Sequence, residues 1–258
     1  MINNSTFLCK GTYGKVYKAS IGEKEVAVKK FCLKKNASTF ENETFFAFKT
    51  RNLKHCVQGV KSYVQDSTGY LIMDLCETDL YKICNTKDCF VEAEAALIFY
   101  RVCKAVEELH DSNIAHLDLK LENLLVSSTG EIKICDFGSA VNTEKDGRAL
   151  LHKKTGTPIY VAPELKRERN ILAKNADIWS LGVIFHLLLT RSYPTRDFEV
   201  YLTPDSFTLE STYGLSTNAQ NLAEQLLSFD VSKRPNIKQI LKHKFFKDHS
   251  AILKKNIQ

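Results

Sequence analysis

The 258-residue chain lacks the marks of a membrane or secreted protein. It has no uninterrupted run of about 18 apolar residues, the length that crosses a bilayer. The longest apolar run, from Ile178 to Leu189, contains Ser180 and His186, and the N-terminus has neither a basic start nor an apolar signal core. The eight cysteines show no Cys-x-x-Cys spacing, which argues against a zinc site or a disulfide framework. The sequence therefore predicts reduced thiols in an intracellular, cytoplasmic protein with no membrane span.

Local clusters of charges of one sign are also scarce in the sequence. The formal net charge is +6, but the lysines are spread along the chain and are not interleaved with aromatic residues. This distribution predicts a solvated basic surface, and nucleic acid is not expected as a partner. With only five prolines and no Pro- or Ser-rich linker, two tightly coupled parts are expected. An apolar fraction of 44% is enough for a sizeable core.

Polar residues with a distinct chemistry are concentrated between positions 116 and 138. Asp118, Lys120, Asn123 and Asp136 are set among apolar runs that read as short strands. They comprise a base, a cation and two oxygen ligands for a metal. This set suits phosphoryl transfer, in which catalysis depends on positioning and on charge neutralisation.

The spacing Asp118-x-Lys120-x-x-Asn123, followed by Asp136-Phe-Gly, resembles the catalytic loop and metal-binding motif of the eukaryotic protein kinases. The resemblance implies that Asp118 orients or accepts the proton of the attacking hydroxyl and that Lys120 neutralises the γ-phosphate. Asn123 and Asp136 would hold Mg²⁺, with Mn²⁺ as the alternative ion. The arginine that usually precedes the catalytic aspartate is replaced by Leu117, which argues against activation through a phosphate on the activation segment.

The N-terminal segment predicts a β-hairpin followed by a third strand. Gly11 and Gly14 resemble the nucleotide lid, although Cys9 stands at the first glycine position, and Lys29 resembles the lysine that grips the α- and β-phosphates. A helix is predicted over 36–53, with Ser38 and Glu41 as a capping box. Glu43 is preferred over Glu41 as the partner of Lys29. The alternative is that both glutamates only favour the helix N-terminus.

The resemblance also places the nucleotide pocket. Strands are expected over 60–64 and 70–75, and the second leads into a hinge. The implied contacts are Val16, Ala27 and Leu125 around the adenine, Met73 as gatekeeper, Asp74 and Cys76 for the adenine edge, Asp79 for a ribose hydroxyl, and Cys135 facing the pocket.

Beyond the catalytic stretch, residues 139–154 lack periodicity and predict a mobile segment. Thr155–Glu164 resembles the end of a kinase activation segment, and Thr157 matches the threonine that hydrogen-bonds the catalytic aspartate and lysine in serine/threonine kinases. Residues 152–154 read as a solvated basic loop or as a site for an acidic group. Asp177 is expected to tie down the catalytic loop, and Glu164 to form a buried ion pair with Arg234. Helices are predicted over 91–110, from 177, and over 217–229 and 237–246, before a basic tail; residues 191–216 read as irregular.

The predicted fold class is α+β, a two-lobed protein kinase fold in a single domain over 1–258. The lobe of antiparallel strands and one main helix spans 1–75, the hinge 76–80 and the mainly helical lobe 81–258. The predicted function is transfer of the γ-phosphate of ATP to serine or threonine of protein substrates. The alternative is a pseudokinase scaffold, favoured by Cys9 and Leu117; a small-molecule kinase is a third option. The divergent motifs also suggest, by analogy alone, a source in a large DNA virus.

Overall fold

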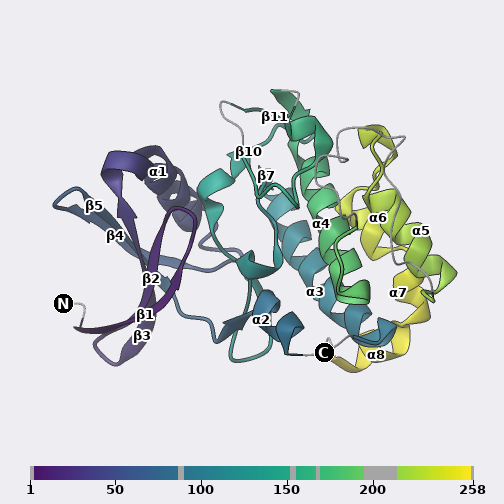
Figure 1. Cartoon of the computed structure of the whole chain (residues 1–258), viewed down its shortest axis with the longest axis horizontal. Helices are drawn as coiled ribbons and strands as arrows, with labels where there is room; N and C mark the ends of the chain where they lie inside the picture. The colour runs from purple at the N-terminus through teal and green to yellow at the C-terminus, as the bar shows by residue number, and fades with distance from the viewer. Residues whose placement is uncertain (1–2, 87–89, 152–154, 167–168, 195–213, 257–258) are drawn as a thin grey trace.

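The computed structural model describes residues 3–86, 90–151, 155–166, 169–194 and 214–256. The expectations for residues 152–154 and for most of 191–216 therefore lie outside the described residues. The chain forms a smaller lobe of strands with one helix and a larger, mainly helical lobe, as predicted (Figure 1). Within the described residues, no helix combines the length and the apolar character that crossing a bilayer requires.

The smaller lobe is built on an antiparallel sheet in the order β1-β2-β3-β5-β4. Its strands are β1 (Asn3–Lys10), β2 (Gly14–Ile21), β3 (Lys24–Cys32), β4 (Gly59–Gln65) and β5 (Thr68–Asp74). The β1–β2 turn requires a glycine at position 14, because a Cβ atom there would lie 2.4 Å from the Lys30 carbonyl oxygen. The tight β2–β3 packing thus fixes the base of the hairpin.

Helix α1 (Leu33–Lys49) follows β3 without a loop. The predicted capping box is wrong: the helix begins after Cys32, which makes no side-chain cap, and it ends at Lys49. Asn36 interrupts the helix with φ −130° and ψ 27°, and its side chain donates to the Tyr13 carbonyl at 3.0 Å. This kink ties the first turn of α1 to the β1–β2 turn.

The larger lobe is organised around α3 (Glu92–Asp111) and α4 (Ala173–Thr190). Helix α4 is buried along almost its whole length, which explains its apolar sequence, and it begins four residues before Asp177. The other helices are α2 (Leu80–Asn85), α5 (Thr217–Leu226), α6 (Ile237–Leu241), α7 (Lys244–Asp248) and α8 (Ser250–Asn256). Short 3₁₀ turns cover Leu121–Asn123, Phe137–Ser139, Pro163–Lys166 and Val231–Lys233.

One prediction for the C-terminal part is wrong. The single helix expected over 237–246 is split into α6 and α7, because the His243 side chain accepts from the Phe245 amide at 3.2 Å and starts a new helix. The two lysines of the expected basic tail are exposed in the last turn of α8, whose Leu253 is buried against the core.

Short strands connect the helices to the catalytic stretch. β6 (Thr78–Asp79), β8 (Leu124–Val126) and β9 (Ile132–Ile134) form one sheet, and β7 (Ile114–Ala115) pairs with β10 (Val141–Asn142). β11 (Arg148–Leu150) pairs with β12 (Asn170–Leu172). The segment over 139–154, which is predicted to be mobile, contains the short strands β10 and β11, and its mobility stays a prediction. Their partners lie far away along the chain, so no local periodicity marks them.

Candidate active site

A buried aspartate, Asp177, holds the backbone of the predicted catalytic loop. The Asp177 carboxylate accepts from the backbone amides of His116 at 2.9 Å and of Leu117 at 2.8 Å, and it also bonds the His110 ring at 2.9 Å. Leu117 has a φ of 61°, a left-handed conformation that costs a non-glycine residue about 1–2 kcal/mol. Because the fully buried Asp177 carboxylate accepts two hydrogen bonds from this turn, the turn is held in the strained conformation directly before Asp118.

Asp118, Lys120 and Thr157 form a closed triangle of polar contacts. The Lys120 ammonium donates to Thr157 Oγ1 at 2.7 Å, and that hydroxyl donates to Asp118 Oδ1 at 2.7 Å. Lys120 also lies 3.1 Å from Asp118 Oδ2. Thr157 belongs to the segment that resembles the peptide-docking end of a kinase activation segment. This segment therefore contacts both residues that are predicted to carry out the chemistry.

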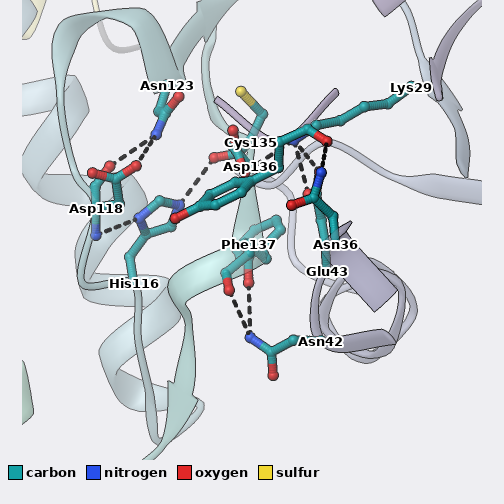
Figure 2. Close-up of polar contacts among 12 residues, drawn as sticks. Lys29, Asn36, Asn42, Glu43, His116, Asp118, Asn123, Cys135, Asp136 and Phe137 are labelled. Carbon is teal, nitrogen blue, oxygen red and sulfur yellow. Dashed lines mark hydrogen bonds and ion pairs between the residues drawn. The ribbon is translucent and has the colours of Figure 1, made fainter. Parts of the chain in front are cut away.

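The β8–β9 hairpin brings the two predicted metal ligands together. Leu124 pairs with Ile134, and the Cys135 amide donates to the Asn123 carbonyl at 3.0 Å, so that Asp136 follows directly. The Asn123 amide nitrogen donates to the Asp118 carbonyl at 2.8 Å (Figure 2). This bond leaves the Asn123 side-chain oxygen without a hydrogen bond from the described residues.

One amide oxygen and one carboxylate suit Mg²⁺, which is usually held by one or two protein oxygens together with substrate phosphates. Among the described residues no group of three or more His, Cys, Asp or Glu side chains could hold a metal alone. The donor set therefore fits an ion that arrives with a nucleotide, held by Asn123 and Asp136.

Lys29 lies between two carboxylates. Its ammonium contacts both oxygens of Glu43 at 2.8 Å and Asp136 Oδ1 at 3.0 Å, while Glu43 is only 2% exposed. Burial lowers the pKa of Lys29, but the two carboxylates outweigh it and leave this pKa above its ordinary value. Burial likewise raises the pKa of Asp136, and the stronger effect of Lys29 lowers it below its ordinary range. The lysine is thus held charged, and the short β3–α1 junction places Glu43, not the exposed Glu41, beside it.

The same helix turn holds the Asp136-Phe137-Gly138 motif through a residue that no sequence pattern marked. Asn42 donates to the carbonyl oxygens of Phe137 and Gly138, both at 3.2 Å (Figure 2). It also donates to the carbonyl oxygen of Ala140 at 3.0 Å. An asparagine within a helix carries no recognisable signal for such a role.

The predicted nucleotide contacts lie along the junction of the lobes. Strand pairing sets Ala27 beside Met73, and Met73 lines a small cavity of about 10 Å³ with Cys135 and Asp136. Val16 and Leu125 are half-buried on β2 and β8, and Gly11 donates its amide to the Gly14 carbonyl at 2.9 Å. Shielding from water and the Asp136 carboxylate raise the pKa of the Cys135 thiol well above its ordinary value.

The hinge aspartates already have partners. The Asp74 carboxylate accepts from Lys24 at 2.9 Å, and Asp79 caps α2 by accepting from the Lys82 amide at 2.8 Å. Cys76 is half-buried between them. The cap occupies Oδ1 of Asp79, and Oδ2 lies 3.2 Å from the Lys82 ammonium; the role of Asp79 in nucleotide binding stays a prediction.

Tyr13, at the tip between Gly11 and Gly14, is a further residue that sequence reasoning missed. Its side chain packs against the cluster of Phe31, Phe40 and Leu71. Burial raises its pKa, the carboxylates of Asp118 and Asp136 add to the rise, and a hydrogen bond to Ser139 opposes it. The sequence signal that could have marked Tyr13 is an aromatic residue placed between the two glycines of the turn.

A buried ion pair fixes the far end of the activation segment. Arg234 donates to the two oxygens of Glu164 at 2.6 and 2.9 Å, and its guanidinium lies 5.0 Å from the centre of the Trp179 ring. It also donates to the carbonyls of Ser228 at 2.7 Å and Asn175 at 3.0 Å. The predicted pair is therefore present, with additional backbone partners.

Comparison with known proteins agrees with this arrangement. The model of the family described as "Protein kinase domain" matches residues 2–246, so the chain belongs to the protein kinase domain family. It is 37% identical over 175 residues to CBL-interacting protein kinase 31 of Oryza sativa subsp. japonica, covering 66% of this chain and 38% of that one. It is 30% identical over 247 residues to serine/threonine-protein kinase ppk16 of Schizosaccharomyces pombe, covering 93% and 36%. Serine/threonine-protein kinase 33 of Bos taurus is 31% identical over 257 residues, covering 91% and 52%.

The chain thus spans between about a third and a half of the length of these relatives. The two-lobed fold and the family predicted from the sequence are confirmed. The suggestion of a viral source is tested by none of these findings and stays a prediction.

Proposed function

We propose that this chain is a serine/threonine protein kinase that transfers the γ-phosphate of ATP to protein hydroxyls. The contact of Thr157 with both Asp118 and Lys120 carries the proposal, because it joins the expected peptide-docking segment directly to the expected base and cation. Opposite this triangle, Lys29 is held charged by Glu43 and Asp136, ready to pair with phosphate oxygens.

Each residue has a separable task in this proposal. Asp118, oriented by the Thr157 hydroxyl, takes the proton of the acceptor hydroxyl, a contribution typically of about 10²–10⁴ in rate. Lys120 stabilises negative charge on the transferred group, and Lys29 positions the α- and β-phosphates. When bound, Mg²⁺ neutralises and bridges phosphate oxygens, and Asn123 and Asp136 are the residues that would hold it.

The test is transfer of label from γ-labelled ATP, in the presence of Mg²⁺, to a generic protein substrate, followed by identification of the labelled amino acids. We expect phosphoserine and phosphothreonine from the wild type, loss of transfer in Asp136→Asn, and retention in Asp66→Asn. Asp66 is an exposed turn residue of the smaller lobe and controls for the loss of one carboxylate. Wild-type transfer no higher than that of Asp136→Asn would refute the enzyme and favour the pseudokinase. Label on tyrosine would refute the substrate class.

We further propose that the kinase does not depend on a phosphate bound next to the catalytic aspartate. Leu117 is only 2% exposed and belongs to the main core, together with Ala149 and Leu151 of the activation segment. The β11–β12 pairing and the Leu151 amide, which donates to the Arg169 carbonyl at 2.7 Å, add backbone support. Apolar packing and strand pairing would then order the segment in place of an arginine–phosphate contact.

This second proposal predicts that Thr155→Ala keeps transfer within about a factor of three of wild type, a change in the barrier of less than about 1 kcal/mol. The Thr155 hydroxyl is buried and has no hydrogen-bond partner among the described residues, so the substitution breaks no such bond. Treatment with a protein phosphatase should likewise leave transfer unchanged. A tenfold loss in either experiment would mean that a phosphate contributes after all.

A further inference from the structure

A basic groove lies on the larger lobe, outside the candidate active site. Its walls are the end of α3 at 110–111, residues 145–146 between β10 and β11, the first turns of α4 at 174–178, and residues 236–242 on and around α6. The cavity measures about 520 Å³. That volume falls within the range of about 300–1,000 Å³ typical of ligand pockets. In Figure 1 these elements lie on the larger lobe, away from the hinge-side helix α2.

Charge of one sign dominates the basic groove. Four lysines and two carboxylates line it, namely Lys145, Lys174, Lys238, Lys242, Asp111 and Asp146. Both carboxylates are engaged: Asp111 with Lys238 at 2.8 Å, and Asp146 with Arg148 outside the groove at 3.2 Å. Lys145 and Lys242 are exposed and have no ion-pair partner among the described residues. The groove therefore carries uncompensated positive charge.

Lys174 lies deeper than the other lysines. It is half-buried, and its ammonium donates to the Asn113 side-chain oxygen at 3.0 Å, a neutral partner. Partial burial lowers the pKa of Lys174; the carboxylates of Asp111 and Asp146 oppose this, the charge of Lys238 adds to it, and the pKa stays below its ordinary value. A further carboxylate entering the groove would raise this pKa and stabilise the charged lysine.

We propose that the basic groove binds an acidic peptide segment, rich in aspartate and glutamate, of a partner protein. The lysines come from three separate parts of the chain, namely the turn at Lys145, the start of α4 and the region of α6, so that they match several carboxylates along a chain better than one compact anion. No arginine is among the described lining residues, so the planar fork that favours bidentate phosphate recognition is missing.

The amide side chains of the groove do not compete for the ligand. Asn236 and Gln239 bond each other's backbone as a capping box, and Asn175 donates to the Val231 carbonyl at 3.2 Å. Recognition therefore rests on charge, which gives moderate affinity that falls as salt rises.

Binding in this place would reach the activation segment. Lys145 belongs to the β10–β11 turn, which is joined to the groove wall by the Lys174 amide donating to the Gly147 carbonyl at 3.4 Å. Asn113, the partner of the Lys174 side chain, also accepts from the Thr143 amide at 2.9 Å through its carbonyl. An acidic segment that spans Lys145 and Lys242 would thus hold this turn against α6.

The test measures binding by the full chain, without ATP, of a fluorescein-labelled peptide rich in glutamate and aspartate, using fluorescence anisotropy. We expect saturable binding that weakens as salt rises. The double variant Lys145→Glu/Lys242→Glu should bind about tenfold more weakly, because two attractions become repulsions at exposed positions. The matched control Lys61→Glu/Lys254→Glu makes the same change of charge at exposed positions on β4 and α8, and should bind like wild type.

Circular dichroism of both double variants checks that they are folded. Asp136→Asn should bind the peptide like wild type, which would show that peptide binding does not depend on catalysis. An equal loss in the control variant would overturn the proposal, since attraction by the overall charge of +6 would then explain binding. Absence of binding at low salt would also overturn it. Displacement of the peptide by inorganic pyrophosphate, at a concentration well below that of the peptide, would also overturn the proposal, because it would identify a site for a compact phosphate.

Discussion

Replacing Glu164 with glutamine would keep the volume of the side chain but leave the Arg234 guanidinium buried without its charge partner. The Arg234 side chain is 0% exposed and Glu164 is 7% exposed, so water cannot take the place of the lost carboxylate. Removing one partner of a buried pair typically costs about 3–5 kcal/mol. Because domains are commonly stable by about 5–15 kcal/mol, this change should remove a large part of the stability.

The measurement is urea unfolding followed by far-UV circular dichroism and by the fluorescence of Trp179, the one tryptophan of the sequence. Its ring centre lies 5.0 Å from the guanidinium carbon of Arg234, so its emission reports directly on this site. The double variant Glu164→Gln/Arg234→Met should recover part of the loss, since no unpaired charge remains. Lys233→Met is the control, because Lys233 is exposed and lies 3.9 Å from Asp230 at the surface. It should change stability by less than about 0.5 kcal/mol.

Kinase activity should fall with the stability of Glu164→Gln, since Glu164 closes the activation segment. A loss below about 1 kcal/mol with an unchanged urea dependence would refute the reasoning. It would mean that the backbone carbonyls around Arg234 satisfy the guanidinium without the carboxylate.

Three further predictions concern the active site. Lys29→Met should lower transfer at least about 100-fold. In the wild type, burial raises the pKa of Glu43 to about 8 although Lys29 opposes the rise, so removing the lysine should raise this pKa further. Because the proton on Glu43 is then lost at a greater cost in stability as pH rises, the melting temperature should trail wild type more at pH 9 than at pH 6. A deficit independent of pH would contradict this. Gly156→Ala should cost about 2–4 kcal/mol, because φ is +90° and its Cβ would lie 2.8 Å from a catalytic-loop carbonyl. The control Gly130→Ala, with φ +76° and open space, should cost about 1–2 kcal/mol, and equal losses in a urea titration would remove the steric argument. Cys135 should react with iodoacetamide more slowly than Cys9 and Cys32, which are exposed, at pH 8, because its raised pKa leaves little thiolate; faster labelling by mass spectrometry would refute this.

The sequence predicted most where residue type and short spacing determine the chemistry. Asp118, Lys120 and Asn123 lie on one loop, and Asp136 follows a hairpin whose register the alternation of apolar residues sets. The choice of Glu43 agrees with its position beside Lys29 in the structure, since a helix that starts directly after β3 leaves little freedom. Their catalytic roles still rest on the proposed experiments.

The sequence predicted less where long-range contacts determine structure. β10 and β11 are too short to show a period, and they exist because β7 and β12 supply their hydrogen bonds. Asn42 belongs to no motif, and its bonds to the carbonyls of residues 137, 138 and 140 arise only when the two lobes meet. The capping box of Ser38 failed because the last residue of β3 leads directly into the helix.

Consecutive residues of α1 hold two different parts of the candidate active site. Asn42 bonds three carbonyls of the Asp-Phe-Gly turn, and Glu43 bonds the lysine on β3. A rotation or outward swing of this helix would break both sets of bonds in one movement. Lys29 and the Phe137–Ala140 segment next to Asp136 would then lose these partners together. The position of α1 is therefore coupled both to the lysine predicted to bind phosphates and to the aspartate predicted to bind the metal ion, and a shift of the helix would affect both at once.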